Sequence, residues 1–215
     1  DWENTTDSGV VTVNSCSAVG SVQGTIYTGG LVGRNGYEAP PGSSVGYNYY
    51  GGTIENSYAT GNVSATSERV GGLIGESRVY SVISECFALG NVSGTIHVGG
   101  LIGLIEAHSD VSNCFARGNV SGTKSIGGLI GPIGSATTLL NSYSTGSVTY
   151  SEDVHIGGLV AQIDLYENST ACFYDRETSG QSGSNTGITP MYTTEMKTLT
   201  TFTNAGWDFT GETVN

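Results

Sequence analysis

Short runs of apolar residues recur along the chain, separated by glycines and by segments rich in serine and threonine. One phrase, Gly-Gly-Leu-Ile/Val-Gly/Ala, opens at Gly29, Gly71, Gly99, Gly127 and Gly157, so successive copies are 42, 28, 28 and 30 residues apart. Runs of four to six β-branched, aromatic and leucine residues bounded by glycine are typical of strands, and no apolar pattern has the 3.6-residue period of a helix. A unit of about 28 residues with two or three such strands predicts one coil of a parallel β-helix.

A second phrase lies between the copies of the first and is clearest in residues 56–63, Asn-Ser-Tyr-Ala-Thr-Gly-Asn-Val. When the copies are aligned, residues at the same phase form columns that stack along a solenoid. The leucine column contains Leu31, Leu73, Leu101, Leu129 and Leu159. The aromatic column contains Tyr58, Phe87, Phe115, Tyr143 and Phe173. We expect these rings to form an offset ladder, and we expect the repeated glycines at corners where φ is positive or two backbone segments pass closely.

The four cysteines fall in one further column, which contains Ser57 and Ser142 in other coils. Its cysteine members are Cys16, Cys86, Cys114 and Cys172. Because serine and cysteine replace one another there, we interpret the column as buried small side chains. Only Cys86 and Cys114 lie on consecutive coils, and the side chains of parallel strands in register point the same way, which disfavours a disulfide. The even number of cysteines therefore does not indicate a disulfide framework.

These columns predict an all-β fold, a right-handed parallel β-helix of about six coils over residues 1–173, with a length of ~25–30 Å at strand spacing. The long first interval contains an insertion of 13 residues in the segment 34–52, which holds four of the chain's 12 tyrosines. Residues 174–215 have a different texture and are expected to form a mostly irregular capping tail. One short helix is predicted there at residues 193–197, from a threonine cap and an acidic first turn.

The net charge of the chain excludes some classes of binding partner. With 19 acidic and 7 basic residues, the formal net charge is −12. A polyanion repels phosphate backbones, so we expect no nucleic-acid partner and no binding to anionic lipid surfaces. No apolar run approaches the ~18 residues needed to span a bilayer, and the first residues do not form a signal peptide, as in a processed secreted chain or a fragment.

No catalytic or metal-binding constellation is evident. The chain has no His-Glu-x-x-His motif, and its three histidines are His97, His108 and His155. His97 and His155 share a column but lie two coils apart, about 9–10 Å, which is too far to share one zinc ion. Glu152 and Asp153 form an acidic pair that is a weak candidate for calcium binding. We therefore expect a protein that is not an enzyme and has no cofactor.

The two phrases resemble the repeats of GLUG-motif proteins. The resemblance covers roughly residues 10–173 and is carried by residues 71–75, Gly-Gly-Leu-Ile-Gly, together with residues 56–63. Such repeats occur in large secreted and surface proteins, including adhesin-like proteins and IgA-cleaving metallopeptidases of bacteria. The resemblance implies a β-solenoid in an extracellular or cell-surface protein, and it implies no activity for the repeats themselves.

The leading functional hypothesis is a non-enzymatic structural and adhesive segment. Tyrosines combine an apolar ring with a polar tip, so Tyr37, Tyr47, Tyr49 and Tyr50 of the insertion are candidates for contacting a glycan or a protein partner. Two alternatives remain open. One is a carbohydrate-active module, a lyase, hydrolase or sugar-binding unit with a groove along the helix. The other is a filament subunit that pairs with copies of itself through its end coils or through residues 1–15.

Overall fold

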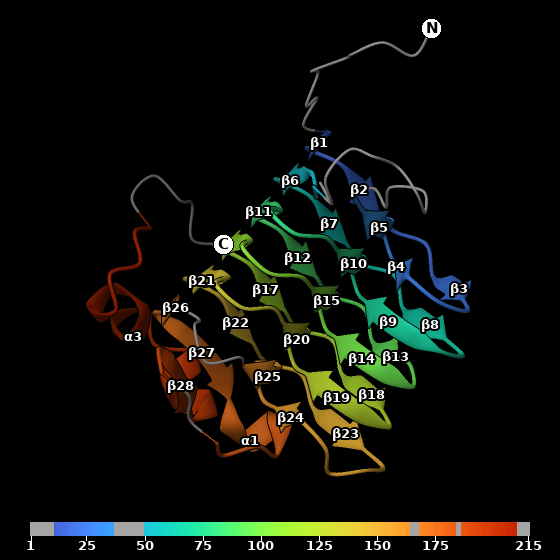
Figure 1. Cartoon of the computed structure of the whole chain (residues 1–215). Coiled ribbons are helices and arrows are strands. Elements are labelled where there is room, and N and C mark those ends of the chain that lie inside the picture. The colour runs from blue at the N-terminus through green and yellow to red at the C-terminus, as the bar shows by residue number, and fades with distance from the viewer. Residues whose placement is uncertain (1–10, 37–49, 164–167, 184–185, 210–215) are drawn as a thin grey trace, which may run out of the picture.

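The strands wind into a parallel β-solenoid, in which each complete coil contributes one strand to each of five sheets (Figure 1). The structure is a computed structural model that describes residues 11–36, 50–163, 168–183 and 186–209. Strands in each sheet pair in parallel, as expected for successive coils that follow the same path. The coils are stacked from β1 at one end to β26 and β27 at the other (Figure 1).

The five sheets are named A to E in the order in which the chain visits them. Sheet A contains β1 (Thr12–Asn14), β6 (Thr53–Glu55), β11 (Val82–Ser84), β16 (Asp110–Ser112), β21 (Thr138–Leu140) and β26 (Asn168–Thr170). Sheet B contains β2 (Ser17–Ala18), β7 (Tyr58–Ala59), β12 (Phe87–Ala88), β17 (Phe115–Ala116), β22 (Tyr143–Ser144), β27 (Cys172–Asp175) and β28 (Ile188–Met191). Sheet C contains β3 (Val22–Gly24), β8 (Val63–Ala65), β13 (Val92–Ser93), β18 (Val120–Gly122) and β23 (Val148–Tyr150).

The remaining two sheets carry the Gly-Gly-Leu phrase. Sheet D contains β4 (Thr28–Gly29), β9 (Glu68–Gly71), β14 (Ile96–Gly99), β19 (Lys124–Gly127) and β24 (Ile156–Gly157). Sheet E contains β5 (Val32–Asn35), β10 (Ile74–Ser77), β15 (Ile102–Ile105), β20 (Ile130–Ile133) and β25 (Val160–Ile163). The predicted parallel β-solenoid is thus confirmed. The predicted count of about six coils is slightly too high, because sheets C, D and E have five strands each.

The predicted columns stack in register. Leu73, Leu101 and Leu129 are fully buried, and the Leu73 amide donates to the Leu101 carbonyl oxygen at 2.9 Å. Leu159 is buried too, whereas Leu31 is only partly buried because it lies in the first described coil, which has a described neighbour on one side only. This stacking builds the main apolar core, with a second valine-rich core between sheets C and D.

The aromatic column forms the expected ladder on sheet B. The rings of Tyr58, Phe87, Phe115 and Tyr143 stack at centroid distances of 4.8, 4.9 and 5.1 Å, with interplanar angles of 1–5°. Phe173 continues the backbone register beyond Tyr143, and its ring packs against residues of the tail. The ladder therefore runs along the solenoid up to the tail.

The repeated glycines serve close backbone approach rather than left-handed corners. A Cβ at Gly71 would lie 2.0 Å from the Ile74 carbonyl oxygen, and one at Gly99 would lie 1.9 Å from that of Ile102. The left-handed corners before sheet B are instead occupied by residues other than glycine, including Asn56 with φ 50°. Asparagine tolerates this region because its short side chain bonds locally. Of the two alternatives predicted for these glycines, close backbone approach is confirmed, and none of them has a positive φ.

The cysteine column is buried except at its first member. Cys86, Cys114 and Cys172 are buried, Cys16 is exposed, and all four are free thiols. The expectation of a uniformly buried column is therefore wrong for Cys16, which lies in the first described coil and is covered by a described coil on one side only.

The tail is more regular than predicted. Strand β27 extends to Asp175, and β28 then pairs with it in sheet B, so the solenoid pattern continues past residue 173. The tail contains three short helices: α1 (Arg176–Ser179) lies between β27 and β28, and α2 (Thr193–Met196) and α3 (Leu199–Asn204) follow β28. Helix α2 confirms the predicted helix, although its N-cap is Tyr192 rather than a threonine, and the Tyr192 amide donates to the Glu195 carboxylate at 2.7 Å.

Candidate functional site

The described residues just before and just after 37–49 lie side by side on the solenoid. Asn35, at the end of β5, is 7% exposed, and its side chain makes two hydrogen bonds with Gly52. The Asn35 amide nitrogen donates to the Gly52 carbonyl oxygen, and the Gly52 amide donates to the Asn35 side-chain oxygen, both at 2.9 Å. The Gly51 amide also donates to the Val79 carbonyl oxygen at 2.7 Å. We call Asn35, Gly51 and Gly52 the neck, because these bonds hold both ends of the insertion against the next coil.

A buried row of hydroxyl groups continues from the neck into the solenoid. The Asn35 amide nitrogen also donates to the Ser77 hydroxyl at 2.9 Å, and that hydroxyl donates to the Ser81 hydroxyl at 2.7 Å. The Ser81 amide donates to the Ser109 hydroxyl of the following coil at 3.1 Å. All three serines are buried. Buried polar groups that are satisfied in this way fix one geometry, so the neck has a defined conformation.

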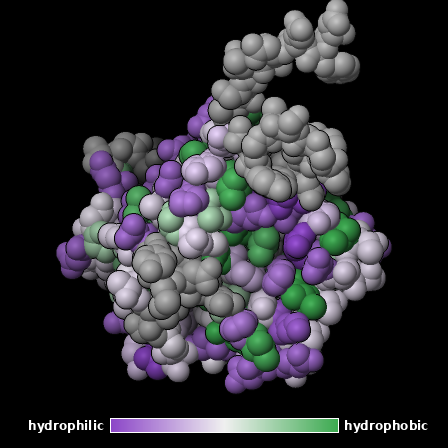
Figure 2. Space-filling model, in the orientation of Figure 1, coloured by the Kyte–Doolittle hydropathy of each residue, from purple (hydrophilic) through white to green (hydrophobic). Residues whose placement is uncertain are grey.

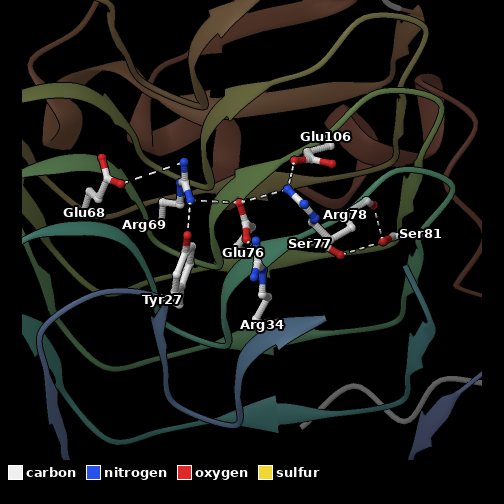
Figure 3. Close-up of polar contacts among 9 residues, drawn as sticks. All are labelled: Tyr27, Arg34, Glu68, Arg69, Glu76, Ser77, Arg78, Ser81 and Glu106. Atoms are coloured by element: carbon white, nitrogen blue, oxygen red, sulfur yellow. Dashed lines mark hydrogen bonds and ion pairs between the residues drawn. The ribbon is translucent and has the colours of Figure 1, made fainter. Parts of the chain in front are cut away.

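Next to the neck lies a cluster of ionised side chains around Glu76 (Figure 3). Glu76 is fully buried on β10, in register with Arg34 on β5. Arg34 Nε lies 2.6 Å from Glu76 Oε2, Arg69 Nη1 lies 3.2 Å from Oε1, and Arg78 Nη1 lies 3.8 Å from Oε1. Arg78 also forms a close ion pair with Glu106 of the next coil. One buried carboxylate thus draws together three arginines from two coils.

Two further residues complete this charged corner, which we define as Tyr27, Arg34, Glu68, Arg69, Glu76, Arg78 and Glu106. Arg69 Nη1 donates to the Tyr27 hydroxyl at 2.6 Å, and Arg69 Nη2 lies 3.8 Å from Glu68. The guanidinium carbons of Arg34 and Arg69 lie 4.7 and 5.0 Å from the centre of the Tyr27 ring. The three arginines and three glutamates of the charged corner balance in formal charge. A balanced group of this kind tolerates burial, whereas removing one member leaves an uncompensated charge.

Sequence reasoning missed the charged corner, although a signal for it exists. In the repeat, Arg34 and Glu76 occupy the position that holds Leu104 in the next coil, so two opposite charges follow one another in one column. Reading the columns for adjacent opposite charges, and not only for shared residue types, would have found the pair.

The predicted tyrosines are only partly placed. Tyr37, Tyr47 and Tyr49 lie outside the described residues. Tyr50 is 50% exposed, and its ring centre lies 5.5 Å from that of Tyr80, which is 54% exposed. The Tyr80 ring in turn stacks on His108 at 5.2 Å. An exposed aromatic row therefore extends from the neck across two coils, and it includes Tyr80 and His108, which the sequence had not assigned to the candidate surface.

The other candidate residues do not assemble into a chemical site. Glu152 and Asp153 are exposed in the turn after β23. Within the described ranges, no group of three or more His, Cys, Asp or Glu residues is arranged to hold a metal ion. His97 has a lowered pKa, chiefly because it is partly buried, and lies in the same column as His155.

The pKa values and hydrogen bonds of the buried thiols reflect their packing inside the solenoid. Burial raises the pKa of Cys114 and raises that of Cys172 to about 11. Cys86 has a lowered pKa because the Cys114 thiol hydrogen-bonds to it. The Cys86 and Cys114 thiols also donate to the carbonyl oxygens of Ser84 and Ser112, each at 3.1 Å. These bonds to their own coils hold the side chains in the column.

The surface around the site is mixed in character. Figure 2 shows apolar residues scattered among polar ones on one face of the solenoid. None of the helices in the described part of the chain has the length and apolar character needed to cross a membrane.

Comparisons with known proteins agree with the repeat found in the sequence. The model of the GLUG motif matches residues 45–64 and 94–121. A stretch of 58 residues, 26% of the chain, is 45% identical to a protein of Evansella cellulosilytica named "Putative Gly-rich membrane protein". The match spans only 7% of the length of that relative. No solved structure matches the chain significantly. The chain therefore carries GLUG-motif repeats, wound into a parallel β-solenoid.

Proposed function

We propose that this chain is a non-enzymatic structural segment of an extracellular or cell-surface protein, and that it presents the insertion 34–52 to a glycan or protein ligand. The repeats are consistent with a structural, surface-type protein, and the similar stretch in a much longer protein named as a membrane protein supports a place in a larger assembly. Metal ions, cofactors, nucleic acid and membrane insertion play no part in this proposal.

The observation that carries the proposal is the neck. Binding residues are often found on loops that a rigid scaffold positions, and a loop with fixed ends loses less conformational entropy when it binds. Here the ends are fixed by the Asn35–Gly52 bonds, and the charged corner packs beside them. The regular coils hold no comparable insertion, since their spacing is 28–30 residues.

The exposed row of Tyr50, Tyr80 and His108 supports the same surface. Exposed aromatic groups contribute large contact areas at a small entropic cost, so they suit recognition of sugar rings and of protein surfaces. Because this row starts at the neck, a ligand held by the insertion can also contact the row.

The proposal is tested by screening the purified chain on a glycan array and against extracts of surface proteins. Any ligand found is then titrated against three variants. Replacing Tyr47, Tyr49 and Tyr50 with alanine should weaken binding at least tenfold, and Tyr80→Ala should weaken it less. The matched control is Tyr150→Ala, since Tyr150 is an exposed tyrosine on sheet C. Unchanged binding by the triple variant would refute the role of the insertion. Release of products from neutral or acidic polysaccharides would refute the non-enzymatic assignment.

A further inference from the structure

A pocket of about 540 Å³ lies where the tail meets sheet B. The solenoid contributes Arg117, Tyr143 and Thr145, and the tail contributes apolar side chains from α2, α3 and the residues after α3. This volume falls in the range of about 300–1,000 Å³ that is usual for ligand sites. The pocket is distant from the neck in the sequence and is not part of the surface proposed above.

Phe202 and Trp207 in the apolar wall of the pocket pack on Phe173 of sheet B, but the outer part of the wall is exposed. Phe202 and Trp207 lie 5.2 Å apart, and Trp207 and Phe209 lie 6.1 Å apart. Phe209 remains 36% exposed and Leu199 58% exposed, and neither α2 nor α3 has a buried residue. Exposed apolar side chains gathered at a concave site are typical of binding surfaces.

The charge that the pocket offers is positive. Arg117 and Lys197 both line it, both are exposed, and within the described ranges neither forms an ion pair, unlike the arginines of the charged corner. Asp175 also lines it but is already used by the fold. One of its oxygens accepts from the Glu177 and Thr178 amides at 3.0 and 3.2 Å, and the other accepts from the Thr193 hydroxyl at 2.7 Å. An occupant should therefore combine a large apolar or aromatic group with adjacent carboxylates.

The chain itself contains such a segment, Asp1-Trp2-Glu3. We propose that the pocket binds residues 1–3 of a second copy, with the Trp2 ring against Phe202, Trp207 and Phe209 and the two carboxylates beside Arg117 and Lys197. A second copy is favoured because β1 and the pocket-forming tail lie at opposite ends of the stack of coils (Figure 1). Among the described strands, β1–β5 each have no partner on their outer edge. In a head-to-tail arrangement these edges would face the tail end of another copy.

Sedimentation velocity of the full chain at rising concentration, in ~0.15 M salt to limit long-range repulsion, tests the proposal. The wild type should associate, and both Trp2→Ala and the double variant Arg117→Glu with Lys197→Glu should weaken the association at least tenfold. Lys124→Glu is the matched control, since this residue is a lysine on sheet D that does not line the pocket. Circular dichroism checks that each variant keeps its strand content.

Charge exchange makes the test specific. A chain with Asp1→Lys and Glu3→Lys should fail to associate with itself but should associate with the Arg117→Glu, Lys197→Glu variant, because the two reversals restore opposite charges. A wild type that stays monomeric throughout overturns the proposal, and so does one in which Trp2 is buried in its own pocket. Association that survives both Trp2→Ala and the pocket variant would also overturn it.

Discussion

One position of sheet E holds Glu76 in one coil and Leu104 in the next. The two side chains are accommodated in different ways. Leu104 is half-buried and uncharged, whereas Glu76 is fully buried and surrounded by arginines. The apolar side chain needs no ionic partner at this position. The ionic arrangement requires three cations at defined distances, and it occurs in the coil that follows the insertion.

The difference teaches what each region contributes. Apolar columns stabilise the solenoid through burial and can be repeated indefinitely. A buried ion group adds little net stability compared with apolar residues, yet it is costly to disrupt. We therefore interpret the charged corner as a device that fixes one arrangement beside the neck, rather than as a source of stability.

The largest expected effect comes from removing the central carboxylate. Glu76→Ala leaves three arginines around a vacant position, and it should lower the free energy of unfolding by ~3–5 kcal/mol. Denaturant unfolding monitored by circular dichroism measures the change. Glu152→Ala, which removes an exposed carboxylate, is the control and should change stability by less than ~0.5 kcal/mol. A small effect of Glu76→Ala would show that the corner does not depend on this charge.

The stability contributed by the cysteine column should respond to alkaline pH. Burial raises the pKa of Cys172 from 9.0 to about 11, so between these values the folded chain holds a proton that the unfolded chain has lost. Stability is therefore full below pH 9 and declines as the pH rises to 11, by about 2–3 kcal/mol from this thiol. Unfolding of the wild type and of Cys172→Ser across pH 8–11 measures the slope. An equal slope in both proteins would contradict the assignment to Cys172.

The neck should show an intermediate effect. Asn35→Ala removes both bonds to Gly52 and leaves a buried amide and a carbonyl oxygen without their partner, so it should cost ~1–3 kcal/mol. Ser121→Ala, a partly buried site on sheet C, is the comparison and should cost less. If both variants unfold at the same denaturant concentration, the neck bonds are not specifically stabilising.

The aromatic ladder should show the smallest effect. Phe115→Leu keeps most of the apolar volume but removes stacking on both Phe87 and Tyr143, so a loss of ~0.5–1.5 kcal/mol is expected. Phe173→Leu tests the end of the column, where the ring contacts Phe202 and Trp207 instead. A double-mutant cycle between Phe87 and Phe115 should give a coupling of similar size, and zero coupling would mean that ring stacking contributes nothing beyond burial.

The sequence was sufficient to predict the coil because the same pattern of apolar residues and glycines occurs five times. Leu101 and Phe115 lie where their columns placed them, since parallel in-register pairing turns each repeat position into a contact with its own copy. The greater exposure of residues in the first described coil could not be predicted from the columns alone. Leu31 and Cys16 belong to the same columns, yet they are more exposed because the first described coil has a described neighbour on one side only.

The candidate site was predictable only in outline. The spacing located the insertion, and Tyr50, one of its candidate tyrosines, lies beside the neck. The charged corner depends on side chains from three coils, among them Arg34, Arg69 and Glu106, and on how long flexible guanidinium groups converge on Glu76. The tail could not be anticipated because β28 joins sheet B through residues that share no repeat phrase with the coils.

Native-state amide hydrogen exchange at the neck tests most directly whether the solenoid holds the insertion rigidly. The Gly52 amide is bonded to Asn35, and the Leu73 amide of the same coil is bonded to Leu101. We predict that the two amides have comparable protection, that Asn35→Ala abolishes protection at Gly52, and that protection at Leu73 then remains. Rapid, unprotected exchange at Gly52 in the wild type, with Leu73 fully protected, would contradict the account.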